Sequence, residues 1–194
     1  MSGVRRFAQW GLWFGGALVL LAAVLIGIDV LLRKFLSRSI GGADELAGYA
    51  LAIGTAWGLG ATLLDRAHIR IDSLYVLFPQ KLRLALDVAA IVLLVGFFGL
   101  VTWHGLGVLS QSWTSGSRSQ SALETPTVLP QALWIAGLVA FVAVGILLLV
   151  QALRQMASGD LRGAAKLIST RSAEEEVEDE IRDLKERAER EGRG

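Results

Sequence analysis

The fold class follows from the sequence LPQALWIAGLVAFVAVGILLLVQAL, residues 129–153. It contains no Lys, Arg, Asp or Glu, and Arg154 follows it directly. A helix that crosses roughly 30 Å of hydrocarbon at about 1.5 Å per residue needs about 20 apolar residues. The stretch meets that length, so we predict that it forms a membrane-spanning helix.

Three more stretches are long and apolar enough to cross a bilayer, namely residues 10–32, 46–64 and 82–103. The whole chain is 53% hydrophobic with a mean hydropathy of +0.52, which is rare for a water-soluble domain of 194 residues. The first stretch is too long for the apolar core of a cleaved signal peptide, so we expect it to be retained. We therefore predict an all-α integral membrane protein with four transmembrane helices and a membrane domain over residues 1–155.

The distribution of Lys and Arg predicts how the helices cross the bilayer, because positive charge resists translocation. Ten basic residues fall on the side of the two termini and four on the other side. The ten are Arg5, Arg6, Arg66, Arg70, Lys81, Arg83, Arg154, Arg162, Lys166 and Arg171. The four are Arg33, Lys34, Arg38 and Arg118. We therefore predict that both termini are cytoplasmic.

The chain after the fourth stretch changes in charge. Residues 156–171 form a basic juxtamembrane segment, and residues 172–194 hold 5 basic and 10 acidic residues, a net charge of −5. A thin apolar seam at helical spacing runs through the second segment, formed by Val177, Ile181, Leu184 and Ala188. Because an isolated helix of this length frays in water, we expect a charged cytoplasmic tail, helical or disordered, rather than a docking helix.

The ionisable residues within these stretches and just beyond their ends predict neither a cofactor site nor an ion path. His68 and His104 fall at opposite sides of the membrane, so a single haem iron cannot bind both. Asp29 and Asp87 each have an arginine one helical turn away, so local pairing explains them without a proton relay. The chain has no cysteine, no phosphate-binding loop and no carboxylate cluster. We therefore expect no catalytic, cofactor-binding or metal site and no nucleic-acid partner.

The second stretch carries a stripe of small residues at successive i+4 positions, namely Ala50, Gly54, Gly58 and Thr62. Small side chains let two helix backbones approach closely in lipid. We predict that this stripe packs against another helix, with one of the same chain favoured over one of a partner.

Trp57 lies in the middle of the stretch, away from the aromatic belt of Trp10, Trp13, Trp103 and Trp134. Two roles suit Trp57: it either fills a gap between helices of this chain or packs against a partner subunit.

Several short motifs resemble the small permease subunit of tripartite ATP-independent periplasmic (TRAP) transporters. The first runs from Asp44-Glu45-Leu46-Ala47-Gly48-Tyr49 through Gly58 to His68-Ile69-Arg70-Ile71-Asp72. Arg33 ends the first stretch, and Ser121-Ala122-Leu123-Glu124-Thr125-Pro126 resembles the family's entry to its last helix. The resemblance covers residues 1 to about 155. Gly48 and Ile53 depart from it, where the family often has a basic and an aromatic residue.

The resemblance implies a subunit of a sodium-driven secondary importer of organic acids in the bacterial inner membrane. A large multi-helix permease subunit would move the substrate, and a soluble periplasmic protein would deliver it. The small subunit would scaffold the large one in the lipid bilayer and help to dock the binding protein. Among the matching residues, Arg33, Glu45, His68 and Asp72 are the candidates for structural or interface roles.

Two further expectations concern arginines on the periplasmic side. We expect Arg33 to be held by Glu45 or Asp29, because an unpaired guanidinium in partly desolvated surroundings is costly. Arg118 suits a contact with a docking protein.

The alternatives to a transporter subunit are a membrane enzyme or electron-carrier subunit with interfacial histidines, and a free-standing structural protein with four membrane spans.

Overall fold

The computed structural model describes residues 2–66, 78–168, 181–182, 184–185 and 188. Its main helices are α1 (Ser2–Leu36), α2 (Ala43–Leu64), α4 (Gln80–Ser115), α5 (Val128–Ala157) and α6 (Leu161–Ile168). Within the described part of the chain, β-type pairing is limited to one isolated bridge between Arg118 and Pro126. Four of the helices are long and apolar enough to cross a membrane. The prediction of an all-α protein with four candidate spans is therefore confirmed.

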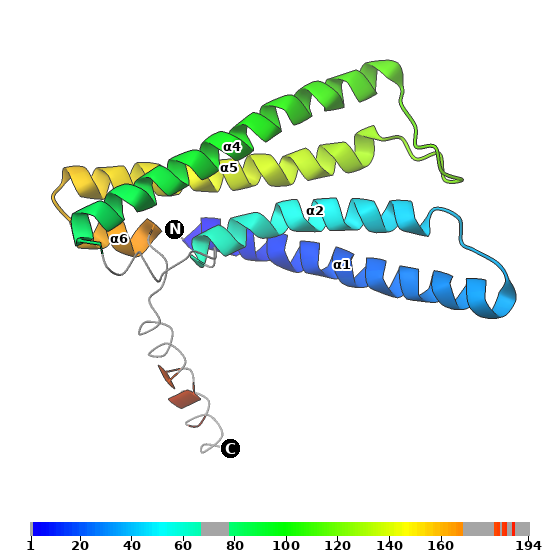
Figure 1. The fold of residues 1–194 in the computed structure, drawn as a ribbon, viewed down its shortest axis with the longest axis horizontal. Helices are drawn as coiled ribbons and strands as arrows, with labels where there is room; N and C mark the ends of the chain where they lie inside the picture. Colours follow the sequence, from blue (N-terminus) through cyan, green and yellow to red (C-terminus); the bar gives the residue numbers. More distant parts are fainter. Residues whose placement is uncertain (1, 67–77, 169–180, 183, 186–187, 189–194) are drawn as a thin grey trace.

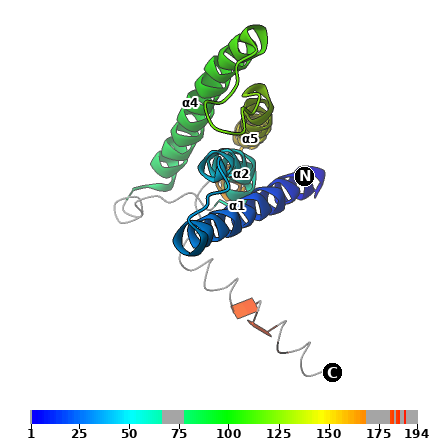
Figure 2. The same ribbon diagram turned by 90° about the vertical axis from the view of Figure 1, so that its right-hand side faces the viewer.

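The four long helices form an open layer rather than a closed bundle. Their order across the layer is α1, α2, α5, α4, and each packs on its neighbour in that order (Figures 1 and 2). In the most apolar part of α2 and α5, 44% and 39% of the residues are buried, against 17% in both α1 and α4. α2 and α5 are therefore the central helices, and α1 and α4 are the edges.

The main apolar core lies at the end of the layer where α6 packs on α4 and α5 (Figure 1). The rings of Phe98 and Phe141 meet edge to face with centroids 4.8 Å apart. The buried members of the core are Leu63, Leu84, Ile91, Phe141, Val144, Leu148, Ala152, Ala164 and Ile168. The fifth helix, α6, therefore adds buried apolar contacts at this end of the layer.

α6 occupies part of the segment 156–171, for which the sequence indicated only a basic juxtamembrane stretch. Gly159 has a φ of 84°, which lets the chain turn sharply after α5. The Asp160 carboxylate then accepts a hydrogen bond from the Gly163 backbone N–H at 2.8 Å and caps the new helix. Ala164 and Ile168 bury the apolar side of α6 in the core.

The helices extend beyond the predicted spans, most of all α4, which continues past residue 103 to Ser115. His104, the first residue after the predicted span, therefore lies within the helix and has an exposed side chain. The hydroxyls of Thr114 and Ser115 donate to the Gln111 carbonyl, which keeps polar side chains compatible with the helix. Gly116, with a φ of 60°, ends it. Hydropathy marks the part of a helix that suits hydrocarbon, whereas backbone hydrogen bonds and caps set its ends.

Candidate functional site

The candidate site lies at the end of the layer opposite α6, where residues 37–42 join α1 to α2 and residues 116–127 join α4 to α5 (Figure 1). We call residues 29–45 and 116–127 the loop end. It brings together several residues that the sequence singled out, among them Arg33, Glu45 and Arg118.

Asp29 fixes the turn from α1 to α2. Its side chain is 2% exposed, although it lies on an edge helix. One carboxylate oxygen accepts hydrogen bonds from the Ser39 hydroxyl at 2.9 Å and the Ile40 backbone N–H at 2.7 Å. The other oxygen lies 2.5 Å from the Arg33 guanidinium. Asp29 therefore holds the loop back onto the helix from which it emerges.

Arg33 bridges the two helices of the turn. Besides Asp29, its guanidinium lies 3.6 Å from the carboxylate of Asp44 in the first turn of α2. The expected contact with Asp29 is present, but the second partner is Asp44 rather than Glu45. Successive residues of a helix point about 100° apart, so the two acidic residues face different neighbours. Asp44 faces α1, and Glu45 faces the loop from α4 to α5.

Glu45 ties the two loops of the loop end together. Its carboxylate accepts a short hydrogen bond from the Ser121 hydroxyl. The hydroxyls of Tyr49, Ser119 and Thr125 also lie close enough to interact with it. Two parts of the family-like sequence, 76 residues apart, therefore meet at one carboxylate.

The same loop also packs on the glycines of the α1–α2 turn. Gly42 has a φ of 90°, and a Cβ atom added there would lie 2.6 Å from the Leu123 side chain. A Cβ atom on Gly41 would lie 3.5 Å from the Cβ of Ala122. The glycine pair thus provides both the left-handed backbone of the turn and the space in which residues 121–123 rest.

Arg118 stabilises its own loop. The Ser119 N–H donates to the Thr125 carbonyl at 2.9 Å, and the Thr127 N–H donates to the Ser117 carbonyl at 3.1 Å. The exposed Arg118 guanidinium donates to the Glu124 carbonyl at 3.1 Å across this narrow hairpin. Arg118 therefore has an internal partner while it remains on the surface.

The glycine stripe of α2 faces α1 of the same chain. A Cβ atom added to Gly54 would lie 2.8 Å from the carbonyl oxygen of Gly15, and one added to Gly15 would lie 2.5 Å from that of Gly54. Gly58 is less crowded, with a Leu12 methyl 3.8 Å from such an atom. This α1 partner was not predicted from the sequence. Its signal was available, because Gly11 and Gly15 repeat the same i+4 spacing of small residues.

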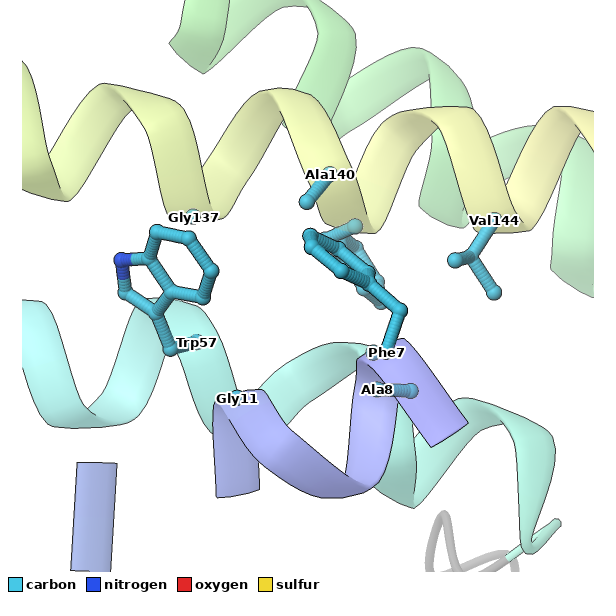
Figure 3. Close-up of a pocket in the computed structure, with 9 residues that line it drawn as sticks. Phe7, Ala8, Gly11, Trp57, Gly137, Ala140 and Val144 are labelled. Carbon is cyan, nitrogen blue, oxygen red and sulfur yellow. The ribbon is translucent and has the colours of Figure 1, made fainter. Parts of the chain in front are cut away.

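Trp57 lies where α1, α2 and α5 meet (Figure 3). Its indole N–H donates to the Leu133 carbonyl of α5 at 2.9 Å, and its ring centroid lies 6.0 Å from that of Phe7 and 5.7 Å from that of Phe14. A Cβ atom on Gly137 would lie 2.8 Å from the indole. Trp57 thus packs within this chain, where small residues of two neighbouring helices accommodate it.

A void of about 10 Å³ remains beside Trp57, lined by apolar residues such as Ala140 and Val144 (Figure 3). A buried water needs about this much space and two to four polar partners. The void is therefore a small packing gap and not a ligand site.

Two of the sequence-predicted residues, His68 and Asp72, lie outside the described residues. Among the residues that are described, no group of three His, Cys, Asp or Glu side chains is placed to hold a metal ion. The described residues of the loop end therefore form hydrogen bonds that stabilise the turns, and they present exposed charged groups.

Comparison with known proteins identifies the family. Residues 10–155 match the family described as tripartite ATP-independent periplasmic transporters, DctQ component. The chain is also 28% identical over 137 residues to a probable peptidoglycan glycosyltransferase FtsW of Halothiobacillus neapolitanus, an alignment that covers 60% of this chain and 31% of that protein. Because that match leaves out most of the other protein, it transfers no activity. No solved structure matches. The chain belongs to the DctQ family and is a small multi-pass membrane subunit of a TRAP transporter, not an enzyme.

Proposed function

We propose that this subunit is a scaffold in the bacterial inner membrane. It holds a large multi-helix permease subunit in the bilayer and helps to dock a soluble periplasmic binding protein, for the sodium-driven import of organic acids. The observation that carries the proposal is the open layer of helices. A layer leaves two broad apolar faces for lipid or for the helices of a partner, whereas a closed bundle would bury them.

The edge helix α4 illustrates this surface. Four large side chains spaced along it are mostly exposed: Leu93 at 72%, Phe97 at 62%, Leu100 at 59% and Trp103 at 74%. Helix association in lipid depends on close van der Waals packing, and such side chains supply the contact area. An edge helix of this kind suits contact with a larger membrane protein.

The buried ionisable residues support a scaffold rather than a transport path. Among the described residues, the charged side chains that are buried are Asp29 and Asp87. They lie on opposite edges of the layer, Asp29 near the end of α1 and Asp87 near the start of α4. Secondary transporters build their sites near the bilayer midplane from interrupted helices. Here α1, α2, α4 and α5 run without a break, so the described part of the chain offers a substrate no comparable site.

The loop end is suited to contact a soluble protein. Asp44 is 84% exposed and Arg33 52%, and Arg118 and Glu124 are also on the surface. Charges of both signs on an exposed face favour complementary docking and faster encounter. The excess of Lys and Arg at the other end of the helices places the loop end on the periplasmic side in our proposal.

Co-purification with the large subunit tests the scaffold. The tagged chain, co-expressed with the large permease subunit and extracted in mild detergent, should elute with it at a fixed ratio. A free-standing membrane protein with four spans would elute without it. Elution of the tagged chain alone, with intact large subunit in the unbound fraction, would refute the proposal.

A further inference from the structure

A polar and aromatic stripe occupies the outer face of α1 near its N-terminus. Arg6, Gln9, Trp10 and Trp13 follow at i, i+3, i+4 and i+7, so they share one face of the helix. They are the described residues that line an open cavity of about 480 Å³. The two indoles are 76% and 78% exposed, so other described parts of the chain leave them largely uncovered.

The two neighbouring arginines of α1 have different surroundings. Arg5 pairs with Asp65 at the end of α2, with 3.2 Å between guanidinium and carboxylate. Arg6 has no carboxylate partner among the described residues, and it lines the cavity. The first turn of α1 also holds no acidic residue, so the partial positive charge of its backbone N–H groups is not offset there. The stripe therefore offers a cation and no anion.

The depth of the four residues matches the layers of a phospholipid. At about 1.5 Å per residue, Trp10 lies about 6 Å and Trp13 about 10 Å further along the helix than Arg6. Tryptophan prefers the level of the headgroups and glycerol esters, and arginine extends towards the phosphates. Beyond Trp13, the same face of the helix continues with the small, exposed residues Gly16 and Ala17 and then with Leu20, which is 70% exposed.

We propose that this stripe binds one anionic glycerophospholipid, of the phosphatidylglycerol class. Arg6 binds the phosphate, Gln9 and the indole N–H groups bind the glycerol and ester oxygens, and an acyl chain lies along the small residues Gly16 and Ala17. A bilayer supplies an anion at this depth beside apolar surface, which matches the two indoles and Arg6, a cation with no carboxylate partner among the described residues. The proposal does not depend on the transport role of the subunit.

Native mass spectrometry of the full chain tests the site. The chain in detergent is titrated with phosphatidylglycerol or with zwitterionic phosphatidylethanolamine, and the apparent Kd of the first bound lipid is measured. The chain should prefer phosphatidylglycerol. Arg6→Gln should weaken its binding about five-fold, since one basic residue near a membrane surface contributes about 1 kcal/mol. Arg6→Lys should restore most of the affinity, because an ammonium also binds phosphate.

Lys34→Gln is the matched control, because it removes one exposed positive charge from the other end of the same helix. It should leave the affinity unchanged. Equal affinity for the two lipids, wild-type affinity in Arg6→Gln, or equal losses in Arg6→Gln and Lys34→Gln would each overturn the proposal. So would displacement of the lipid by the large permease subunit, because a protein would then occupy the stripe.

Discussion

At the scale of single residues, the guanidinium of Arg33 joins the end of α1 to the start of α2. It contacts the buried Asp29 at 2.5 Å and the exposed Asp44 at 3.6 Å. Lys34 follows it in sequence, and its ammonium lies over the Phe35 ring at 5.5 Å rather than between two carboxylates. Arg33 and Lys34 therefore carry the same charge at neighbouring positions but differ in their contacts. A comparison of variants at the two positions isolates the effect of the Arg33 contacts.

We expect Arg33→Ala to lower the yield of correctly assembled protein more than Lys34→Ala. Loss of Arg33 leaves the buried Asp29 carboxylate without its cation, and such a carboxylate is costly in poorly hydrated surroundings. The yield is measured as the monodisperse fraction after detergent extraction. Equal yields of the two variants would remove Arg33 from the structural residues.

Adjacent glycines of α1 provide a second matched pair. A Cβ atom on Gly15 would lie 2.5 Å from the Gly54 carbonyl oxygen, whereas one on Gly16 would meet nothing within 4 Å. Gly15→Ala should force α1 and α2 apart and destabilise the protein by about 1–3 kcal/mol, as overpacking does. Gly16→Ala should be neutral or stabilise it by up to about 1 kcal/mol, because alanine favours a helix. Thermal unfolding in detergent measures both, and a more stable Gly15→Ala variant would disprove the close α1–α2 contact.

At the scale of elements, Glu45 should hold the loop from α4 to α5 against α2. Glu45→Ala removes the acceptor of the Ser121 hydroxyl, so residues 116–127 should open more often. The backbone N–H groups of Ser119 and Thr127 should then exchange faster with deuterium, while those of the α5 core keep their protection. Asp44→Ala is the control, because Asp44 faces α1. Faster exchange in the control alone would contradict the assigned contacts.

The sequence predicts the elements that depend on local pattern. Residues 129–153 and the three other apolar stretches form helices that are long and apolar enough to cross a membrane, as a helix in hydrocarbon requires. Asp29 and Arg33 pair because one helical turn separates them. Both features depend only on residues that lie close together in the sequence.

Other elements depend on contacts between distant residues or on capping. α6 is an 8-residue helix, too short for a hydropathy window, although Leu161, Ala164, Ala165 and Ile168 have helical spacing. The choice of Asp44 over Glu45 as the partner of Arg33 depends on how α2 is rotated. The contact of Glu45 with Ser121 depends on the arrangement of all four long helices. A single sequence contains no direct signal for either.

At the scale of the whole molecule, the predicted direction of insertion can be tested with single cysteines. The natural chain has no cysteine, so each introduced one is the only reactive thiol. The excess of basic residues near the termini predicts that cysteines at Ser2 and Ser172 resist a membrane-impermeant thiol reagent in intact cells, while one at Ser115 reacts. Labelling at Ser172 without labelling at Ser115 would show the opposite orientation of the chain in the membrane.

The open layer of helices underlies our proposal that this chain supports transport but does not carry substrate. The measurement that tests this proposal is the uptake of organic acids into liposomes under a sodium gradient. The purified chain alone should give no uptake. The large permease subunit with the binding protein should give uptake only when this chain is also present. Uptake by this chain alone, or full uptake without it, would contradict the account.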